Sequence, residues 1–427
     1  MSALPGTASS GPGTPDGQPW SVPEIAGAVR EGRRTAVAVA DALLARTGAG
    51  GARHPLLAVD PEMLRAAAAA LDRRTDRFAL PLAGVPVAVE DGVSVTGRGD
   101  EPVRRLRAAG ALIAGSARTA EFDIGPDGSP GGRATVAAVA AGTVPLAIGV
   151  DGDGALRAAA AAHGLVALKP GRRVLPLPAT AERRWSGLAE TTVVAATPQD
   201  LLVALDVLSV PARRGPATAS RSGPGDPFGR PPSGAADPGG PGPAGTHLGS
   251  LACSLRIGRS RLADPAAAAG VQAAVRMLDA AGVRLLAADP PYSAVLAVHG
   301  ARRRQAGLAR RIEDLDLDPA GLPRAARSAL RRGRRVRRLG GLRPATPASW
   351  RQRLVGWLDE AGAEAALLPA TAGPAGAGTT GLAVWNLAGL PSLVTPVHHG
   401  GRSTCVQLVG RPGSERRLLA TAALLAP

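Results

Sequence analysis

The sequence predicts an α/β protein built on a mixed or parallel sheet. Between residues 85 and 164, short apolar segments rich in β-branched residues alternate with segments of helical character, which is the pattern of βαβ units. The chain has 427 residues, enough for one large α/β domain or two ordinary ones. Its 45% apolar content supports a sizeable core, built mainly from Ala, Val and Leu because aromatic residues make up only 2%.

The predicted elements follow one another along the chain. Two short helices over residues 22–47 and a third starting at Pro61 precede the alternating part. Strands are expected at 85–91, 111–116 and 144–151, and helices at 101–110, 134–142 and 154–164. In the C-terminal half, strands are expected at 253–260, 283–289, 363–371, 384–397 and 404–410, and helices at 264–282, 308–330 and 414–426.

Composition predicts the domain organisation. Residues 1–19 are rich in Gly, Pro and Ser and predict a disordered tail. We expect one domain over 20–427, with a low-complexity, flexible insertion at 211–246. The N-terminal stretch lacks the features of a signal peptide, and no apolar run reaches the ~18 residues of a spanning helix. Cys253 and Cys405 give no disulfide framework, so we expect a cytoplasmic protein away from membranes.

The net charge of +16 raises the question of nucleic-acid binding. Lys169 is the only lysine, and the arginines are spread along the chain beside 56 Gly and 39 Pro, a composition typical of a GC-rich bacterial genome. The densest run, "RRGRRVRR" at Arg331 to Arg338, could bind phosphates. The acidic cluster from Glu313 to Asp318 could neutralise it, and no aromatic stacking platform is nearby. A solvated arginine face is therefore favoured, and nucleic acid is not the expected partner.

Several separated motifs resemble one known family. "PLAGVPVAVED" is similar to "PLxGVPVAVKD", and "AIGVDGDGALR" to "ALGTDTGGSIR". "GLVALKPGRRV" resembles "GVVGLKPTxGRV", and "NLAGLPSLVTPV" followed by "VQLVG" resembles the C-terminal motifs. These strings, in this order, are typical of the amidase signature family of Ser–Ser–Lys amide hydrolases. The resemblance implies a large mixed β-sheet sandwiched between layers of α-helices, and hydrolysis of carboxamide C–N bonds.

The resemblance also locates the catalytic positions of the family, and none carries the expected residue. The general base is the lysine of "VAVKD", where this chain has Glu90. The nucleophile is the last serine of "GTDTGGS", where this chain has Ala155. The bridging serine, bound by a cis peptide in the family, falls on Gly131 or Arg133, depending on the alignment. Neither side chain can relay a proton, and alanine has no nucleophilic atom.

The nucleophile loop itself is partly retained. Gly152, Asp153 and Gly154 form the expected pocket and oxyanion loop, and Asp151 with Arg157 supports it. Asp153 replaces a glycine of the family pattern, and a carboxylate there opposes the negative charge that develops in acyl transfer. Lys169 falls on the "GLKP" motif and is expected to be structural.

Three functions remain open from the sequence. The favoured one is a non-catalytic amidase homologue that binds a small amide-like ligand or a protein partner. The second is an active hydrolase with a rebuilt site, in which Glu90 acts as base on a nearby hydroxyl. The hydroxyl candidates are Ser94, Ser129 and Thr135. The third is an arginine-rich nucleic-acid-binding protein.

Two further expectations concern the site. Without a catalytic role, Glu90 is expected to be solvated in an open pocket or paired with Arg133 or Arg157. No cofactor or metal is expected, because the His398-His399 pair lacks further ligands at a usual spacing.

Overall fold

The computed structural model describes residues 21–49, 56–58, 60–90, 100–117, 133–178, 181, 185–209, 246–259, 262–314, 316, 318–340, 342, 346–370 and 381–426. The expected N-terminal tail and, apart from Thr246, the expected insertion at 211–246 lie outside these residues.

The described strands join in one 11-stranded mixed sheet, in the order β1-β3-β2-β4-β6-β5-β10-β11-β9-β7-β8. Their bounds are β1 (Leu56–Ala58), β2 (Pro86–Glu90), β3 (Leu112–Ala117), β4 (Leu146–Asp151), β5 (Val166–Lys169), β6 (Glu190–Ala195), β7 (Ser250–Cys253), β8 (Arg284–Ala287), β9 (Ala365–Pro369), β10 (Ser392–His399) and β11 (Arg402–Gly410). The predicted mixed α/β class is confirmed.

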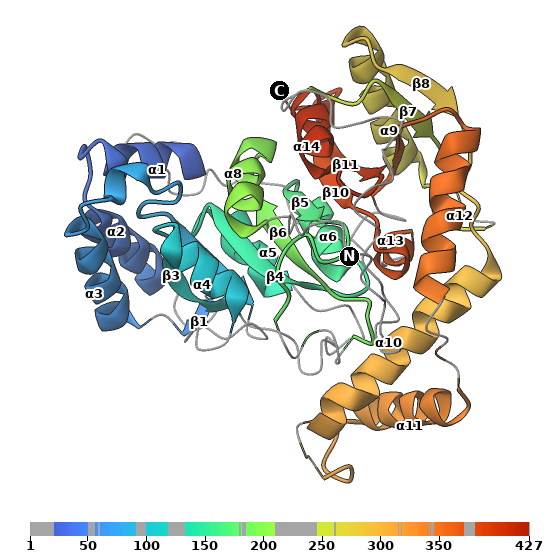
Figure 1. Ribbon diagram of the computed structural model, residues 1–427, viewed down its shortest axis with the longest axis horizontal. Coiled ribbons are helices and arrows are strands. Elements are labelled where there is room, and N and C mark those ends of the chain that lie inside the picture. Colours follow the sequence, from blue (N-terminus) through green and yellow to red (C-terminus); the bar gives the residue numbers. More distant parts are fainter. Residues whose placement is uncertain are drawn as a thin grey trace, which may run out of the picture.

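Helices pack on both faces of this sheet (Figure 1). The helices are α1 (Val22–Arg30), α2 (Ala36–Ala49), α3 (Pro61–Asp72), the 3-10 turn η2 (Arg77–Ala79), α4 (Glu101–Ala108), α5 (Arg133–Ala140), α6 (Ala155–Ala162), α8 (Pro198–Leu208), α9 (Pro265–Ala280), α10 (Ala294–Asp314), α11 (Arg324–Arg338), α12 (Thr346–Glu360), α13 (Ala383–Ala388) and α14 (Glu415–Ala423). Helices α5 and α6 pack together against β4, and α8 packs with α14 against β5, β6 and β11. Within the described residues, no helix combines the length and apolar character needed to cross a membrane.

The parallel pairing of β2 with β4 positions the candidate site. Val89 pairs with Ile148, so both strands end at the same edge of the sheet, β2 at Glu90 and β4 at Asp151. Every residue of β2 is buried, which explains its unbroken apolar run before the glutamate. The chain then turns through residues 152–154 and enters α6 at Ala155.

Three sequence predictions were wrong in detail. Residues 253–260 were expected as a strand, but β7 ends at Cys253, where the Ser254 hydroxyl donates to Asp289 Oδ1 at 2.6 Å and starts a turn. The single helix expected over 308–330 is two helices, α10 and α11, because Pro319 and Pro323 cannot continue a helical hydrogen-bond ladder.

The third correction concerns the start of residues 384–397, which was expected to be a strand. It forms the short helix α13, which ends at Gly389 with a left-handed φ of 67°. Six mostly apolar residues, four of them buried, show too little periodicity for a helix to be distinguished from a strand by sequence. The strand β10 begins only at Ser392.

Candidate functional site

The end of β2, the end of β4 and the start of α6 bring the family positions together. Glu90 is the last residue of β2 and is only 4% exposed. One of its carboxylate oxygens, Oε2, accepts the Val150 backbone N–H at 2.5 Å. A Cβ on Gly149 would lie 2.7 Å from the same oxygen, so only glycine on β4 leaves room for this side chain. The Glu90 side chain is therefore held against β4 at the end of the two strands.

This geometry corrects the expectation that Glu90 is solvated in an open pocket. The alternative pairing with Arg157 is also wrong, because that guanidinium bonds Asp151, Ser392, Asn386 and the Leu382 carbonyl. The Arg133 side chain lies outside the described residues, so that pairing stays a prediction.

Ala155 is the first residue of α6 and follows Gly154, whose φ is 93°. The helix N-terminus directs backbone N–H groups toward this loop, and an acyl-transfer enzyme stabilises an oxyanion with such groups. Here the Gly154 N–H bonds Asp151 and the Ala155 N–H bonds Asp153. The methyl group of Ala155 supplies no nucleophile there. Of the two candidate bridging positions, Gly131 lies outside the described residues and Arg133 begins α5.

Close contacts hold the loop before α6 in one conformation. A Cβ on Gly152 would lie 2.1 Å from the Trp185 ring, and a Cβ on Gly154 would lie 2.4 Å from Leu382 Cβ. The Asp151 carboxylate accepts the Gly154 N–H at 2.5 Å and so ties the two ends of the loop together. Both glycines are required by space, and Gly154, with a φ of 93°, is required by backbone conformation as well.

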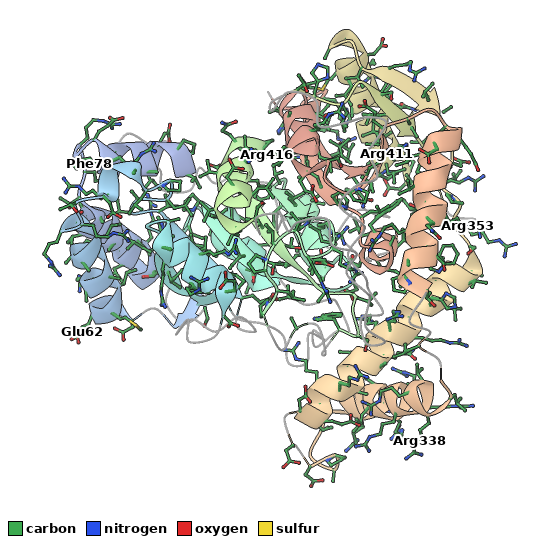
Figure 2. All side chains as sticks on the ribbon, viewed as in Figure 1. Glu62, Phe78, Arg338, Arg353, Arg411 and Arg416 are labelled. Carbon is green, nitrogen blue, oxygen red and sulfur yellow. The ribbon has the colours of Figure 1, made fainter. Side chains whose placement is uncertain are left out.

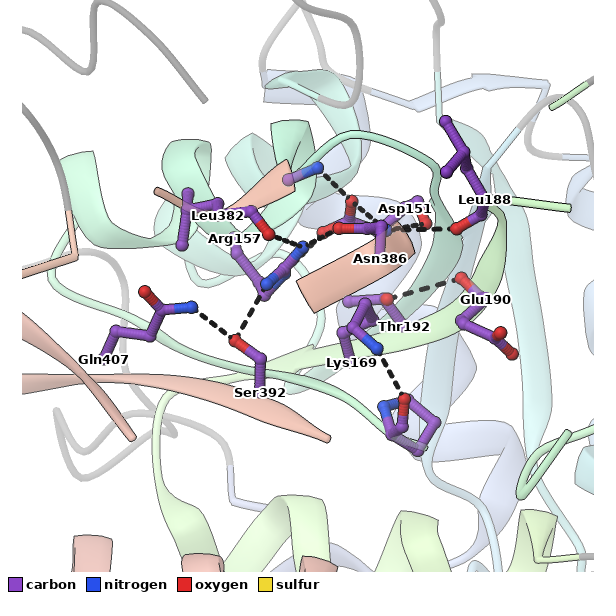
Figure 3. Close-up of polar contacts among 12 residues, drawn as sticks. Asp151, Arg157, Lys169, Leu188, Glu190, Thr192, Leu382, Asn386, Ser392 and Gln407 are labelled. Carbon is purple, nitrogen blue, oxygen red and sulfur yellow. Dashed lines mark hydrogen bonds and ion pairs between the residues drawn. The ribbon is translucent and has the colours of Figure 1, made fainter. Parts of the chain in front are cut away.

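Arg157 connects this loop to the C-terminal part of the chain (Figure 3). Its Nε lies 2.8 Å from Asp151 Oδ2, and both side chains are fully buried. Burial alone would raise the pKa of Asp151, but the Arg157 guanidinium and the Gly154 N–H hold it below its ordinary value. Arg157 Nη1 also donates to Ser392 Oγ at 2.8 Å. The pair is therefore a junction of α6, β4 and β10.

Sequence analysis gave no role to three residues of this network, Asn386, Ser392 and Gln407. Asn386 accepts from Arg157 and donates to the Asp151 carbonyl at 2.8 Å. Gln407 donates to Ser392 Oγ at 2.7 Å. The polar residues embedded in the apolar "NLAGLPS" and "VQLVG" strings were the available signal, since buried polar groups need partners.

Asp153 faces a different environment from Asp151. Its side chain is 6% exposed, and Oδ2 lies 2.7 Å from Nε of Arg304 on α10. Oδ1 has no hydrogen-bond partner among the residues that the structure describes. Burial raises the pKa of Asp153, and neighbouring Asp151 raises it further, although Arg304 and the Ala155 N–H act in the opposite direction. One guanidinium does not compensate for the burial of this carboxylate.

Asp153 lines a cavity of about 640 Å³ between the loop, α10 and α13. Most of the lining is apolar, and the volume is within the ~300–1,000 Å³ range of small-molecule sites. The first half of α10 forms one wall, and the residues before β6 and those of α13 form another. Glu90 and Ala155 are not among the lining residues in the described part of the chain. The polar floor of the cavity is the Asp153–Arg304 pair.

Lys169 lies at the end of β5, outside this cavity. It is fully buried, and its Nζ donates to the Pro170 carbonyl at 2.7 Å. Burial lowers the pKa of Lys169 to about 7, although the carboxylates of Glu190 and Asp151 act in the opposite direction. The amine is enclosed among core residues beneath the Asp151–Arg157 junction (Figure 3).

The remaining candidates are separate from the cavity. His399 Nε2 lies 3.4 Å from Thr404 Oγ1, and no cluster of metal-ligating side chains occurs among the described residues. Burial raises the pKa of Cys253 to about 11 and that of Cys405 to about 12, which makes both thiols poor nucleophiles.

The arginine run forms most of α11, which packs on α10 as an arm that extends from the body (Figure 1). A Cβ on Gly333 would lie 2.1 Å from the Gln305 carbonyl, so the two helices touch there. Glu313 on α10 bonds Arg334 and Arg337, each at 2.8 Å, which gives part of the expected neutralisation. Arg338 lies at the surface of the arm (Figure 2).

The fold defines a mixed α/β protein with a cavity beside one end of its sheet, and comparison with known proteins gives the family. "Putative amidase AmiB2" of Mycobacterium tuberculosis is 31% identical over 420 residues, with 84% of this chain and 85% of that protein covered. "Putative amidase AmiA2" of the same organism is 32% identical over 419 residues, covering 84% and 82%. The chain belongs to the amidase signature family. No family model matches it.

Solved structures show the same fold at lower identity. A 6-aminohexanoate cyclic dimer hydrolase aligns with a TM-score of 0.75 and 21% identity, covering 95% of this chain and 96% of that chain. A bacterial aryl acylamidase of the amidase signature family aligns with a TM-score of 0.70 and 18% identity, covering 95% of each chain.

Proposed function

We propose that this protein is a catalytically inactive amidase homologue that binds a small ligand in the cavity beside α6. The observation that carries the proposal is the pair of side chains at the two family positions within the described residues. Ala155 begins α6 without a nucleophilic atom, and Glu90 is bonded to the sheet edge through Val150 N–H at 2.5 Å. The lysine and serine chemistry of the family has no counterpart at either position.

The loop geometry supports the same reading. Asp153 brings a buried carboxylate next to the first turn of α6, where it would repel the negative charge of a tetrahedral intermediate. The loop packs tightly against Trp185 and Leu382, and a cavity lies beside it. An ordered loop beside a cavity, without the nucleophile and base of the family, is suited to binding a ligand.

A rebuilt hydrolase remains the alternative, and no observation favours it. Glu90 as a base would need a hydroxyl within about 3 Å. Ser94 and Ser129 lie outside the described residues. Thr135 is buried on α5, and its hydroxyl has no hydrogen-bond partner within the described residues, so it is not activated by Glu90. A protein partner stays a second possibility for the binding role.

The test is hydrolysis of a panel of simple amides by the purified full chain, beside Glu90→Gln and the double variant Glu90→Lys with Ala155→Ser. We expect no turnover by the natural protein and no labelling by a serine-reactive fluorophosphonate probe. Residual turnover that disappears on further purification comes from a contaminating hydrolase, whereas turnover that survives purification and persists in Glu90→Gln would also overturn the proposal. Turnover that Glu90→Gln abolishes would overturn the proposal in favour of the rebuilt site. Recovered activity in the double variant would add that the scaffold is still competent.

A further inference from the structure

The cavity carries an unmet hydrogen-bonding capacity that indicates which ligand it takes. Asp153 is 4% exposed and lines the cavity floor, and its Oδ1 has no partner among the described residues. A carboxylate accepts about four hydrogen bonds when all its lone pairs are used, and a buried oxygen without a partner is unfavourable. Rotation about the terminal side-chain bond exchanges the two oxygens easily, so the unmet capacity belongs to the whole carboxylate.

The walls around this carboxylate are apolar. Leu188, Ile257, Leu296, Val384 and Leu387 face the same cavity, and Tyr292 contributes an aromatic ring. Such walls favour a hydrocarbon or aromatic body, and the polar lining residues besides Asp153 are Arg259, Tyr292, Ser293 and Arg304. The ligand is therefore expected to present one polar end to Asp153 and an apolar remainder to the walls.

The carboxylate at position 153 changes the loop from one that offers hydrogen-bond donors to one that offers an acceptor. Where the family pattern has glycine, backbone N–H groups of the α6 N-terminus would meet a ligand carbonyl. Here an acceptor stands in their place, so the ligand must bring the donor. We infer that the cavity binds a compact apolar primary amine as its ammonium ion, with the ammonium on the Asp153 carboxylate; this inference rests on the proposed binding function.

The open acceptor on Asp153 favours an ammonium over its neutral and anionic analogues. A carboxylate ligand would set negative charge against Asp153. A neutral amide would donate an uncharged hydrogen bond, and charge-assisted hydrogen bonds are about twice as strong. Arg304 carries positive charge nearby, but its side chain is 36% exposed and already engages Oδ2. Arg259 also lines the cavity, but its side chain is exposed, so solvent screens its charge.

The experiment compares three probes of one shape by isothermal titration at pH 7: benzylamine, benzamide and benzoate. We expect benzylamine to bind at least tenfold more tightly than benzamide, and benzoate to show no measurable binding. Asp153→Asn should weaken benzylamine binding at least tenfold and change benzamide binding much less.

Two outcomes would overturn the inference: benzoate binding more tightly than benzylamine, or benzylamine affinity unaffected by Asp153→Asn. Absence of binding by all three probes would also overturn it. Asp153→Gly, which restores the family residue, should lose benzylamine binding in the same way and guards against misfolding of a single variant, as checked by thermal unfolding. Benzamide turnover is followed in parallel, because turnover would contradict the proposed inactivity, whereas failure of amine binding alone leaves that inactivity standing.

Discussion

Arg157 Nε and Asp151 Oδ2 lie 2.8 Å apart with both side chains fully buried, and this pair joins the start of α6 to the end of β4. The same guanidinium reaches Ser392 on β10 and the Leu382 carbonyl before α13. Residues more than 200 positions apart in sequence thus meet at one side chain. The junction holds the loop that the family uses for catalysis, and its retention here explains how the loop keeps its shape without a nucleophile.

Removing the cation of this pair should destabilise the protein strongly. Arg157→Met leaves the buried Asp151 carboxylate without its partner, and breaking a buried pair from one side typically costs about 3–5 kcal/mol. We expect the free energy of unfolding in urea to fall by that amount. The matched control is Arg65→Met, whose partner Asp41 is half exposed, and a change below about 1 kcal/mol is expected there. Equal effects of the two substitutions would contradict a special role for the junction.

The junction should also behave as a unit. Asn386 accepts from Arg157 and donates to Asp151, so Asn386→Leu and Arg157→Met remove overlapping contacts. A double-mutant cycle should give a coupling free energy of about 0.5–3 kcal/mol, because residues of one hydrogen-bond network are not additive. Additive losses, within the error of urea unfolding, would show that the two contacts act separately.

Two glycines with positive φ, Gly154 in the loop before α6 and Gly142 after α5, allow the effect of limited space to be separated from that of backbone strain. Gly154 and Gly142 both have positive φ, at 93° and 65°. A Cβ on Gly142 would meet nothing within 4 Å, so Gly142→Ala should lose only about 1–2 kcal/mol of stability from the left-handed conformation. Gly154→Ala adds a clash with Leu382 Cβ at 2.4 Å and should lose clearly more, as measured by urea unfolding. Similar losses at both positions would mean that the loop relaxes away from Leu382.

Much of the fold could be predicted from local sequence patterns. The runs that became β2 and β4 alternate with helical segments, and the last polar residue of each run, Glu90 or Asp151, marks the strand end. The family motifs then placed Ala155 at the start of α6. These features depend on neighbours in the chain, which is why the sequence was sufficient for them.

The contacts that define the site could not be predicted in this way. Burial of Glu90 depends on Gly149 on the neighbouring strand. The environment of Asp153 depends on Arg304, some 150 residues away in the part of α10 that precedes the expected helix at 308–330. The cavity arises between the loop before α6, α10 and α13, and α13 itself was expected as a strand. Such relationships are set by tertiary packing, and no local pattern records them.

Lys169 predicts a rise of stability with pH. Burial lowers its pKa in the folded protein to about 7, whereas an unfolded lysine titrates near 10.4. Between these values the unfolded chain binds more protons than the folded one, so the free energy of unfolding increases with pH, by at most about 1.4 kcal/mol per pH unit. Below pH 7 both states hold the proton and this contribution is flat.

We expect the rise to be visible from pH 7 to about 8, before unfolded thiols, with pKa values near 8.5, begin to titrate. The burial of Cys253 and Cys405 would reverse the slope at higher pH. Lys169→Met keeps the length of the side chain without its proton, and the difference between its urea-unfolding curves and those of the natural protein isolates the effect. A difference that stays constant across this range would mean that Lys169 keeps its proton in the folded core.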